Sequence, residues 1–285
     1  MKRHLPLLLL GAAIFGCSTT SQDTPSPVED VKKEVSTSIL TRLVPIPAGT
    51  YRPLYSAPGE PTEFARPAFQ LEEHPVTNAQ YLAFVEANPR WRKSQVASLM
   101  AEANYLHHWT DDLTFPVEAA DSPVTNVSWF AARAYAHWAG RRLPTLAEWE
   151  SVGMASKTAA FGRDEKGYNQ RILNWYSRPT PPYPESVLSH EPNYFGISDM
   201  HGLIWEWVGD FNSSLSTGES RGDSGLDRNL FCGSGSIGAA DPSDYAAFMR
   251  FAFRGSLDGH FTVNNLGFRC AADSVSTETA TPTKP

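Results

Sequence analysis

Cysteine is scarce in this sequence, with three thiols in 285 residues, at Cys17, Cys232 and Cys270. That number excludes the dense disulfide framework on which many small secreted folds depend. A chain of this length is long enough to bury a hydrophobic core without such crosslinks. Any chemistry that needs two neighbouring thiolates must therefore be sought among very few residues.

Several other signals are missing as well. The net charge is −7 and no basic cluster stands out, so no nucleic-acid partner is expected. No Gly-x-Ser-x-Gly turn follows a strand-like run, which argues against a serine hydrolase. No His-x-x-x-His-x-Glu motif offers a histidine-rich iron site. With 41% hydrophobic and 19% charged residues, the composition is that of a globular protein.

The first residues have the pattern of an export signal. Lys2 and Arg3 precede a short apolar run, Leu5 to Phe15, which is too short to span a membrane. The run ends at Gly16-Cys17, which resembles a bacterial lipobox, so residues 1–16 are predicted to be a signal peptide and Cys17 the lipidated residue. Cleavage without lipidation is the alternative. We expect a lipid-anchored protein of the bacterial cell envelope, at the outer membrane and facing the periplasm.

The remainder divides by composition. Residues 17–40 are rich in Ser, Thr and Pro and are predicted to be a flexible, lipid-attached tether. Residues 41–273 are predicted to form one domain, and 274–285 a disordered tail. Cys232 and Cys270 are candidates for one disulfide in an oxidising periplasm, but their spacing alone neither supports nor excludes it.

Local patterns predict a few short elements. Residues 43–51 alternate apolar residues with prolines and read as an edge strand entering a hairpin. Pro-Val-Thr-Asn precedes an apolar-periodic run at residues 75–78 and again at 123–126, so a helix is expected after each. Tyr81, Leu82 and Val85 should share a face of the first helix, and Phe130, Ala134 and Trp138 of the second. Thr145 and Glu148 form a capping box that opens a third helix. Beyond Lys157 the sequence predicts short strands and long loops.

Four blocks in this order resemble the formylglycine-generating enzyme, or sulfatase-modifying factor, family. The resemblance implies an α+β fold, a C-type-lectin-related mixed domain with little regular secondary structure. The blocks are VTNAQYLAFV (76–85), PVTNVSWFAARAYAHWAGRRLPTLAEWE (123–150), FGISDMHGLIWEWVGD (195–210) and NLGFRCAAD (265–273).

The resemblance also implies a structural calcium ion. The family binds calcium at the turn before its Trp-Glu-Trp block, through two side chains and two backbone carbonyls. The matching positions are Asp199, Gly202, Ile204 and Glu206. Hard oxygen ligands on one tight turn suit this ion. The alternative is that Asp199 and Glu206 brace the loop by hydrogen bonds alone.

The catalytic centre is where the sequence departs from the family. Active members bind copper with two cysteines that follow a Gly-Gly-Ser segment, which corresponds to Cys232-Gly233-Ser234. The two cysteine positions then fall in Ser236–Ala247, which contains no cysteine. Because Cu(I) prefers thiolates, copper is not expected. Formylglycine generation by the known copper chemistry is therefore not expected, and the chain reads as a pseudoenzyme for that reaction.

Residues 219–224, 230–235 and 241–250 are similar to a cysteine-poor, NirV-like subgroup associated with copper nitrite reductases. This resemblance implies an accessory or maturation factor for a periplasmic metalloenzyme of denitrification. A periplasmic protein partner is expected to bind the loop surface around residues 211–261. The alternative is an oxidoreductase like the pyoverdine-maturation branch, which uses this fold without the cysteine pair.

Overall fold

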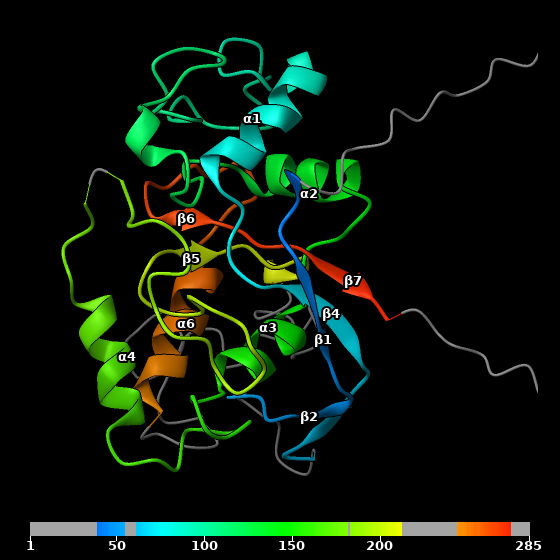
Figure 1. Cartoon of the computed structure of the whole chain (residues 1–285), viewed down its shortest axis with the longest axis vertical. Helices are drawn as coiled ribbons and strands as arrows, with labels where there is room; N and C mark the ends of the chain where they lie inside the picture. Colours follow the sequence, from blue (N-terminus) through cyan, green and yellow to red (C-terminus); the bar gives the residue numbers. More distant parts are fainter. Residues whose placement is uncertain (1–38, 55–60, 182, 213–243, 275–285) are drawn as a thin grey trace, which may run out of the picture. The chain divides into compact units, whose positions relative to one another are not determined.

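The computed structural model describes residues 39–54, 61–181, 183–212 and 244–274. The predicted signal peptide, tether and tail, and Cys232, lie outside these residues, apart from the tether's last two residues and Ser274. The described part is a mixed α+β fold of short helices, short strands and long connections, as expected (Figure 1). No helix in it combines the length and the apolar character needed to cross a membrane.

Three small sheets organise the strands. The first joins β1 (Leu43–Ile46), β4 (Phe69–Glu72) and β7 (Ala271–Asp273) in the order β1-β4-β7, all antiparallel. The second pairs β2 (Gly49–Tyr51) with β3 (Phe64–Arg66), and the third pairs β5 (Trp205–Glu206) in parallel with β6 (Leu266–Gly267).

The strand predicted over residues 43–51 begins where expected, but in the structure it is divided into two separate strands. Its first half, β1, is an edge strand. Its second half, β2, pairs in a different sheet, because Pro47 and Ala48 interrupt the strand and change the direction of the chain. The carbonyl of Pro47 accepts a hydrogen bond from the Arg66 side chain, 2.8 Å long, so this bend is held by a side chain rather than by a ladder.

The three expected helices are present. α1 (Asn78–Ala87) begins at the cap Thr77, and α3 (Leu146–Gly153) begins at Thr145 with the full Thr145–Glu148 capping box. α2 (Trp129–Trp138) is capped by Ser128 and not by the Thr-Asn pair before it.

The faces of α1 and α2 differ in how well they were predicted. Tyr81 and Val85 of α1 are buried as expected, and Leu82 packs partly buried against the same core. On α2 the predicted apolar stripe packs against the core only partly buried, and a neighbouring stripe is buried more deeply. Tyr135 stacks on Tyr81, with ring centroids 5.7 Å apart, so the side of α2 that carries Tyr135 faces the core. The buried residues are Ala131, Ala132, Tyr135 and Ala136, while Phe130, Ala134 and Trp138 flank them partly buried.

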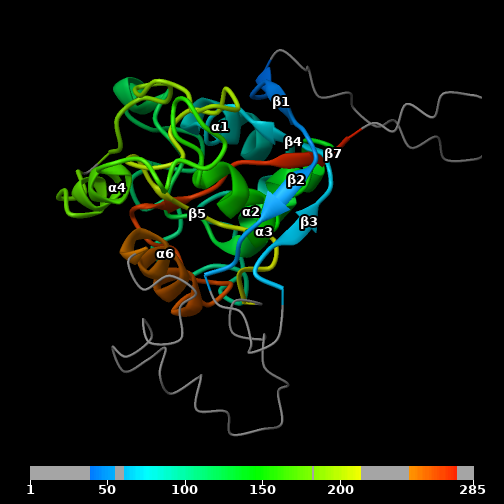
Figure 2. The same cartoon turned by 90° about the horizontal axis from the view of Figure 1, so that it is seen from below.

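Two further helices contradict the expectation of loops beyond Lys157. α4 (Tyr168–Tyr176) begins after Gly167, which has a φ of 80° and no side chain to cap the helix. No Ser, Thr or Asp therefore marks its start in the sequence. α6 (Tyr245–Gly255) begins at Asp244, which accepts from the backbone of Ala247. Tyr168, Ile172 and Ala246 form a small cluster between them. Figure 2, seen with Figure 1, places both helices away from the β1-β4-β7 sheet.

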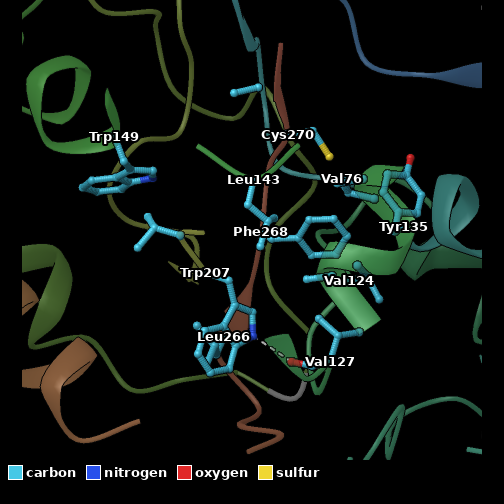
Figure 3. Packing of buried hydrophobic residues seen from close by; sticks show 14 of the residues in the cluster. Val76, Val124, Val127, Tyr135, Leu143, Trp149, Trp207, Leu266, Phe268 and Cys270 are labelled. Atoms are coloured by element: carbon cyan, nitrogen blue, oxygen red, sulfur yellow. Dashed lines mark hydrogen bonds between the residues drawn. The ribbon is translucent and has the colours of Figure 1, made fainter. Parts of the chain in front are cut away.

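The core is aromatic and continuous (Figure 3). Tyr81, Tyr135 and Phe268 pack with ring centroids 5.3 to 6.2 Å apart, mostly edge to face. The buried Trp207 donates from Nε1 to the carbonyl of Val127 at 2.9 Å, which Figure 3 shows as a dashed line. Large rings that also hydrogen-bond to backbone explain how a domain with so little regular structure keeps its loops in place.

Candidate functional site

The segment 199–206, where calcium is predicted, is a tight turn that leads into β5. Asp199 has a φ of 55° and Gly202 a φ of 102°, so two left-handed residues bend the chain within four positions. A Cβ at Gly202 would lie 3.3 Å from the Trp175 ring, a tight contact, and the φ of 102° would strain any residue other than glycine. Ile204 is buried, and both carboxylates, of Asp199 and Glu206, are almost fully removed from solvent.

Glu206 is neutralised by an arginine. Arg269 donates from Nε and Nη2 to the two carboxylate oxygens at 2.8 Å each, and neither side chain is exposed to solvent. Trp149 Nε1 adds a third hydrogen bond of 2.7 Å. The same guanidinium donates to the backbone carbonyls of Ser198 and Asp199, at 3.1 and 3.2 Å. Arg269 therefore ties both ends of the turn to the strand that follows β6.

Asp199 has a different set of partners. Its carboxylate accepts from the backbone N–H groups of Leu188 and His190, at 2.5 and 3.2 Å, and from Nδ1 of His190 at 2.9 Å. The carboxylate thereby holds the preceding loop against the turn and fixes the orientation of the His190 ring.

Both carboxylates of the predicted calcium turn already have partners other than a metal ion. A calcium site needs free oxygen ligands that share one centre, whereas Asp199 is engaged by His190 and Glu206 by the cation of Arg269. No group of three or more His, Cys, Asp or Glu side chains in the described ranges is placed to hold a metal. The contacts correspond to the alternative that the two carboxylates brace the loop by hydrogen bonds. Calcium stays an untested prediction, and no step of the account depends on it.

A pocket lies beside the turn, between α4 and the loop of residues 190–201. It encloses about 410 Å³, within the range of small-molecule sites. Trp175, Ile172 and Met200 give it apolar walls, and His190 and His201 add polar atoms. His201 is buried. Its Nε2 lies 2.8 Å from the carbonyl of Gly153 and its Nδ1 3.1 Å from the Tyr176 hydroxyl. Burial, and then the charge of Arg250, lower the pKa of His201 to about 3, so the ring is neutral.

Behind this pocket lies a buried charge cluster. Arg250 and Arg254, both on α6, bind the carboxylate of Glu150 on α3, and all three side chains are nearly inaccessible. Arg250 donates three hydrogen bonds of 2.8 to 3.0 Å to this carboxylate. Burial alone would raise the pKa of Glu150, but the two arginines outweigh it and lower the pKa to about 2. Arg254 is therefore a structural ion-pair partner of Glu150.

The cysteine positions bear directly on copper chemistry. Cys270 is buried in the core, beside Glu72 and Tyr135, and forms no disulfide with another described residue. Burial, followed by the charge of Glu72, raises the pKa of its thiol well above the usual value. Cys232 lies outside the described residues, so its pairing with Cys270 stays a prediction. Within Ser236–Ala247, the described residues are Asp244 and the first turn of α6, where Ala246 and Ala247 are fully buried.

Sequence reasoning missed the residues that matter most to this region. His190 and Trp175 lie in no motif, and Glu150 ends one of the family blocks without a role assigned to it, because each acquires its role only when distant segments meet. Arg269 lies in the Gly-Phe-Arg block, which was used only as a marker of the family. The sequence offered one hint of the Glu206–Arg269 pair, namely a charged residue inside each of the two otherwise apolar segments Trp-Glu-Trp and Gly-Phe-Arg.

Comparison with known proteins places the chain in a family. It is 33% identical to the formylglycine-generating enzyme of Streptomyces coelicolor, over 77% of this chain and 83% of that protein. It is 29% identical to the formylglycine-generating enzyme of Bos taurus, over 83% of this chain and 76% of the relative. The structure of PvdO from Pseudomonas aeruginosa is similar at a TM-score of 0.43 and 17% identity, over 83% of this chain and 95% of that one. The sulfatase-modifying factor enzyme 1-like domain matches residues 28–274, and the chain belongs to that family.

Proposed function

We propose that this chain is an exported, lipid-anchored accessory protein that assists the maturation of a periplasmic metalloenzyme, of the copper nitrite reductase type. In this proposal it binds a protein partner and does not generate formylglycine. The observation that carries the proposal is the state of its thiols.

A two-thiolate copper site needs two accessible cysteines of ordinary or lowered pKa. Cys17 lies in the predicted lipobox, and Cys270 is buried with a raised pKa. Only Cys232 is left, and one thiol cannot form the pair. The family's copper chemistry is thus not supported by the residues of this chain, which favours a role that depends on binding.

α6 offers a surface for that binding. Tyr245, Phe248, Met249 and Ala252 recur at helical spacing and are exposed or half-exposed, whereas Arg250 and Arg254 face inward. Tyr245 is 49% exposed and stacks on Phe248 at 5.5 Å. An apolar, aromatic stripe that faces outward is typical of a protein-binding surface. It also lies within residues 211–261, where the sequence predicts the partner.

The test uses a bacterium that contains both this protein and a copper nitrite reductase. The gene is deleted and restored as the wild type, as Tyr245→Ser with Phe248→Ser, or as the control Leu99→Ser, which removes an 80% exposed apolar residue elsewhere. We expect the deletion and the double variant to lower the copper content of the purified reductase, and the control to restore it. Full copper loading in the deletion strain would contradict the proposal.

An oxidoreductase on the same fold is the second candidate, because the 410 Å³ pocket beside α4 gives a small substrate a place to bind. Oxygen consumption by the purified protein with a small organic substrate would favour it over the accessory role.

A further inference from the structure

We propose that the pocket between α4 and residues 190–201 binds a small planar aromatic molecule whose O–H or N–H group donates a hydrogen bond to Nε2 of His190. This site is separate from the α6 stripe and goes beyond the accessory role. The size of the pocket, its walls and the orientation of one side chain support this assignment.

The walls suit a flat, apolar ligand. Trp175 forms one side, and it stacks on the neutral ring of His201 with an interplanar angle of 18° and ring centroids 6.1 Å apart. Ile172 and Met200 are buried apolar residues that line the same cavity. Aromatic ligands gain both apolar burial and ring-edge contacts in such surroundings. A volume of about 410 Å³ holds one ring or two fused rings with room to spare.

His190 provides a directed acceptor. Asp199 accepts from Nδ1 at 2.9 Å, so the neutral form of His190 carries its proton on Nδ1 and presents the lone pair of Nε2. The ring is held from a second side by Trp175, which meets it edge to face at 5.6 Å. Nε2 makes no hydrogen bond to any described residue, and His190 lines the pocket. A ligand with a polar hydrogen can therefore satisfy Nε2, and one without it cannot.

The charged residues at the entrance of the pocket do not favour a charged ligand, because they are already paired with one another. Lys157 is paired with Glu191 at 2.6 Å, and Arg171 with Glu165 at 3.5 Å, so each cation at the entrance has its own anion. Phenol and indole meet the requirements of walls, acceptor and rim, because both are flat, neutral and carry one polar hydrogen.

Phenol and toluene are the matched probes, since they differ mainly in that hydrogen-bond donor. Calorimetric titration of the full-length protein should give phenol an affinity about tenfold above that of toluene, as one buried hydrogen bond supplies. His190→Phe should remove this difference by weakening phenol alone. The control is His260→Phe, because His260 makes a similar bond to Asp258, at 2.7 Å, on the surface.

A second measurement needs no variant. Adding phenol to the wild type should shift the NMR signal of the Met200 methyl, which lines the pocket, and leave that of Met100, which is exposed elsewhere, unchanged. Equal affinities for phenol and toluene, an unmoved Met200 signal, or the same loss in His260→Phe as in His190→Phe would each overturn the proposal.

Discussion

Arg269 holds the carboxylate of Glu206 through two hydrogen bonds of 2.8 Å, with both side chains fully shielded from solvent. This pair joins β5 to the segment between β6 and β7 and secures the turn that leads into β5. A buried pair of this kind is costly to break from one side, because the remaining charge keeps its desolvation penalty without a partner.

Arg269→Met should therefore destabilise the domain by about 3–5 kcal/mol. The matched control is Arg42→Met, which breaks the pair with Glu73 whose arginine is 62% exposed, and it should cost about 0–1 kcal/mol. Urea denaturation followed by fluorescence measures both. Similar losses in the two variants would show that the Glu206–Arg269 pair is not a main support of the turn.

Chelation distinguishes the arginine from the predicted calcium ion. Because Arg269 and His190 already satisfy Glu206 and Asp199, the melting temperature should be the same with and without EDTA. Elemental analysis of protein purified without chelator should find no stoichiometric calcium. One calcium per chain, together with a lower melting temperature in EDTA, would restore the sequence-based prediction, since a bound ion stabilises the folded state.

Glu150 should govern part of the acid stability. Its pKa is about 2 in the folded protein, below the ordinary value of 4.5. A carboxyl group with a lowered folded pKa stabilises the fold above its unfolded pKa, and this contribution is lost as the pH falls. The free energy of unfolding should thus decline between pH 4.5 and pH 2.

Glu150→Gln should remove that part of the decline and, at neutral pH, destabilise the domain by leaving Arg250 and Arg254 without an anion. Glu191→Gln is the control, because its pair with Lys157 is largely exposed. An acid limb of the same slope in Glu150→Gln and wild type would contradict the assigned pKa.

Cys17 should carry the lipid that anchors the protein. Cys17→Ser should move the protein from the membrane fraction to the soluble periplasmic fraction, because the thiol is the attachment point. Fractionation followed by immunodetection measures this. If the variant stays with the membranes, the anchor is not at Cys17.

The sequence predicted those parts of the fold that depend on local chemistry. The capping box at Thr145 was predicted because a hydroxyl and an acid stand three residues apart, and the cap at Thr77 because a Thr-Asn pair precedes an apolar-periodic run. α4 was missed because its start uses the conformation of Gly167 and its burial depends on Ala246, far along the chain. The sequence did not show which stripe of α2 is buried most deeply, because contact with Tyr81, a tertiary effect, decides which side of that helix faces inward.

The candidate site shows the same division. Asp199 and Glu206 were identified from a motif, yet their partners, His190 and Arg269, come from other segments. Neither partner follows from spacing, because hydrogen bonds between distant segments leave no period in the sequence. The pocket walls likewise combine α4 with a later loop.

The central claim, that this chain lacks the family's copper chemistry, is tested most directly by incubating the purified protein with a sulfatase-type Cys-x-Pro-x-Arg peptide, copper and oxygen. Cys270 is buried with a raised pKa, and the other two cysteines of the sequence are Cys17, in the predicted lipobox, and Cys232. The account predicts that mass spectrometry finds the peptide cysteine unchanged, while an active formylglycine-generating enzyme assayed in parallel converts it. Conversion of the peptide thiol to the aldehyde by this protein would contradict the account.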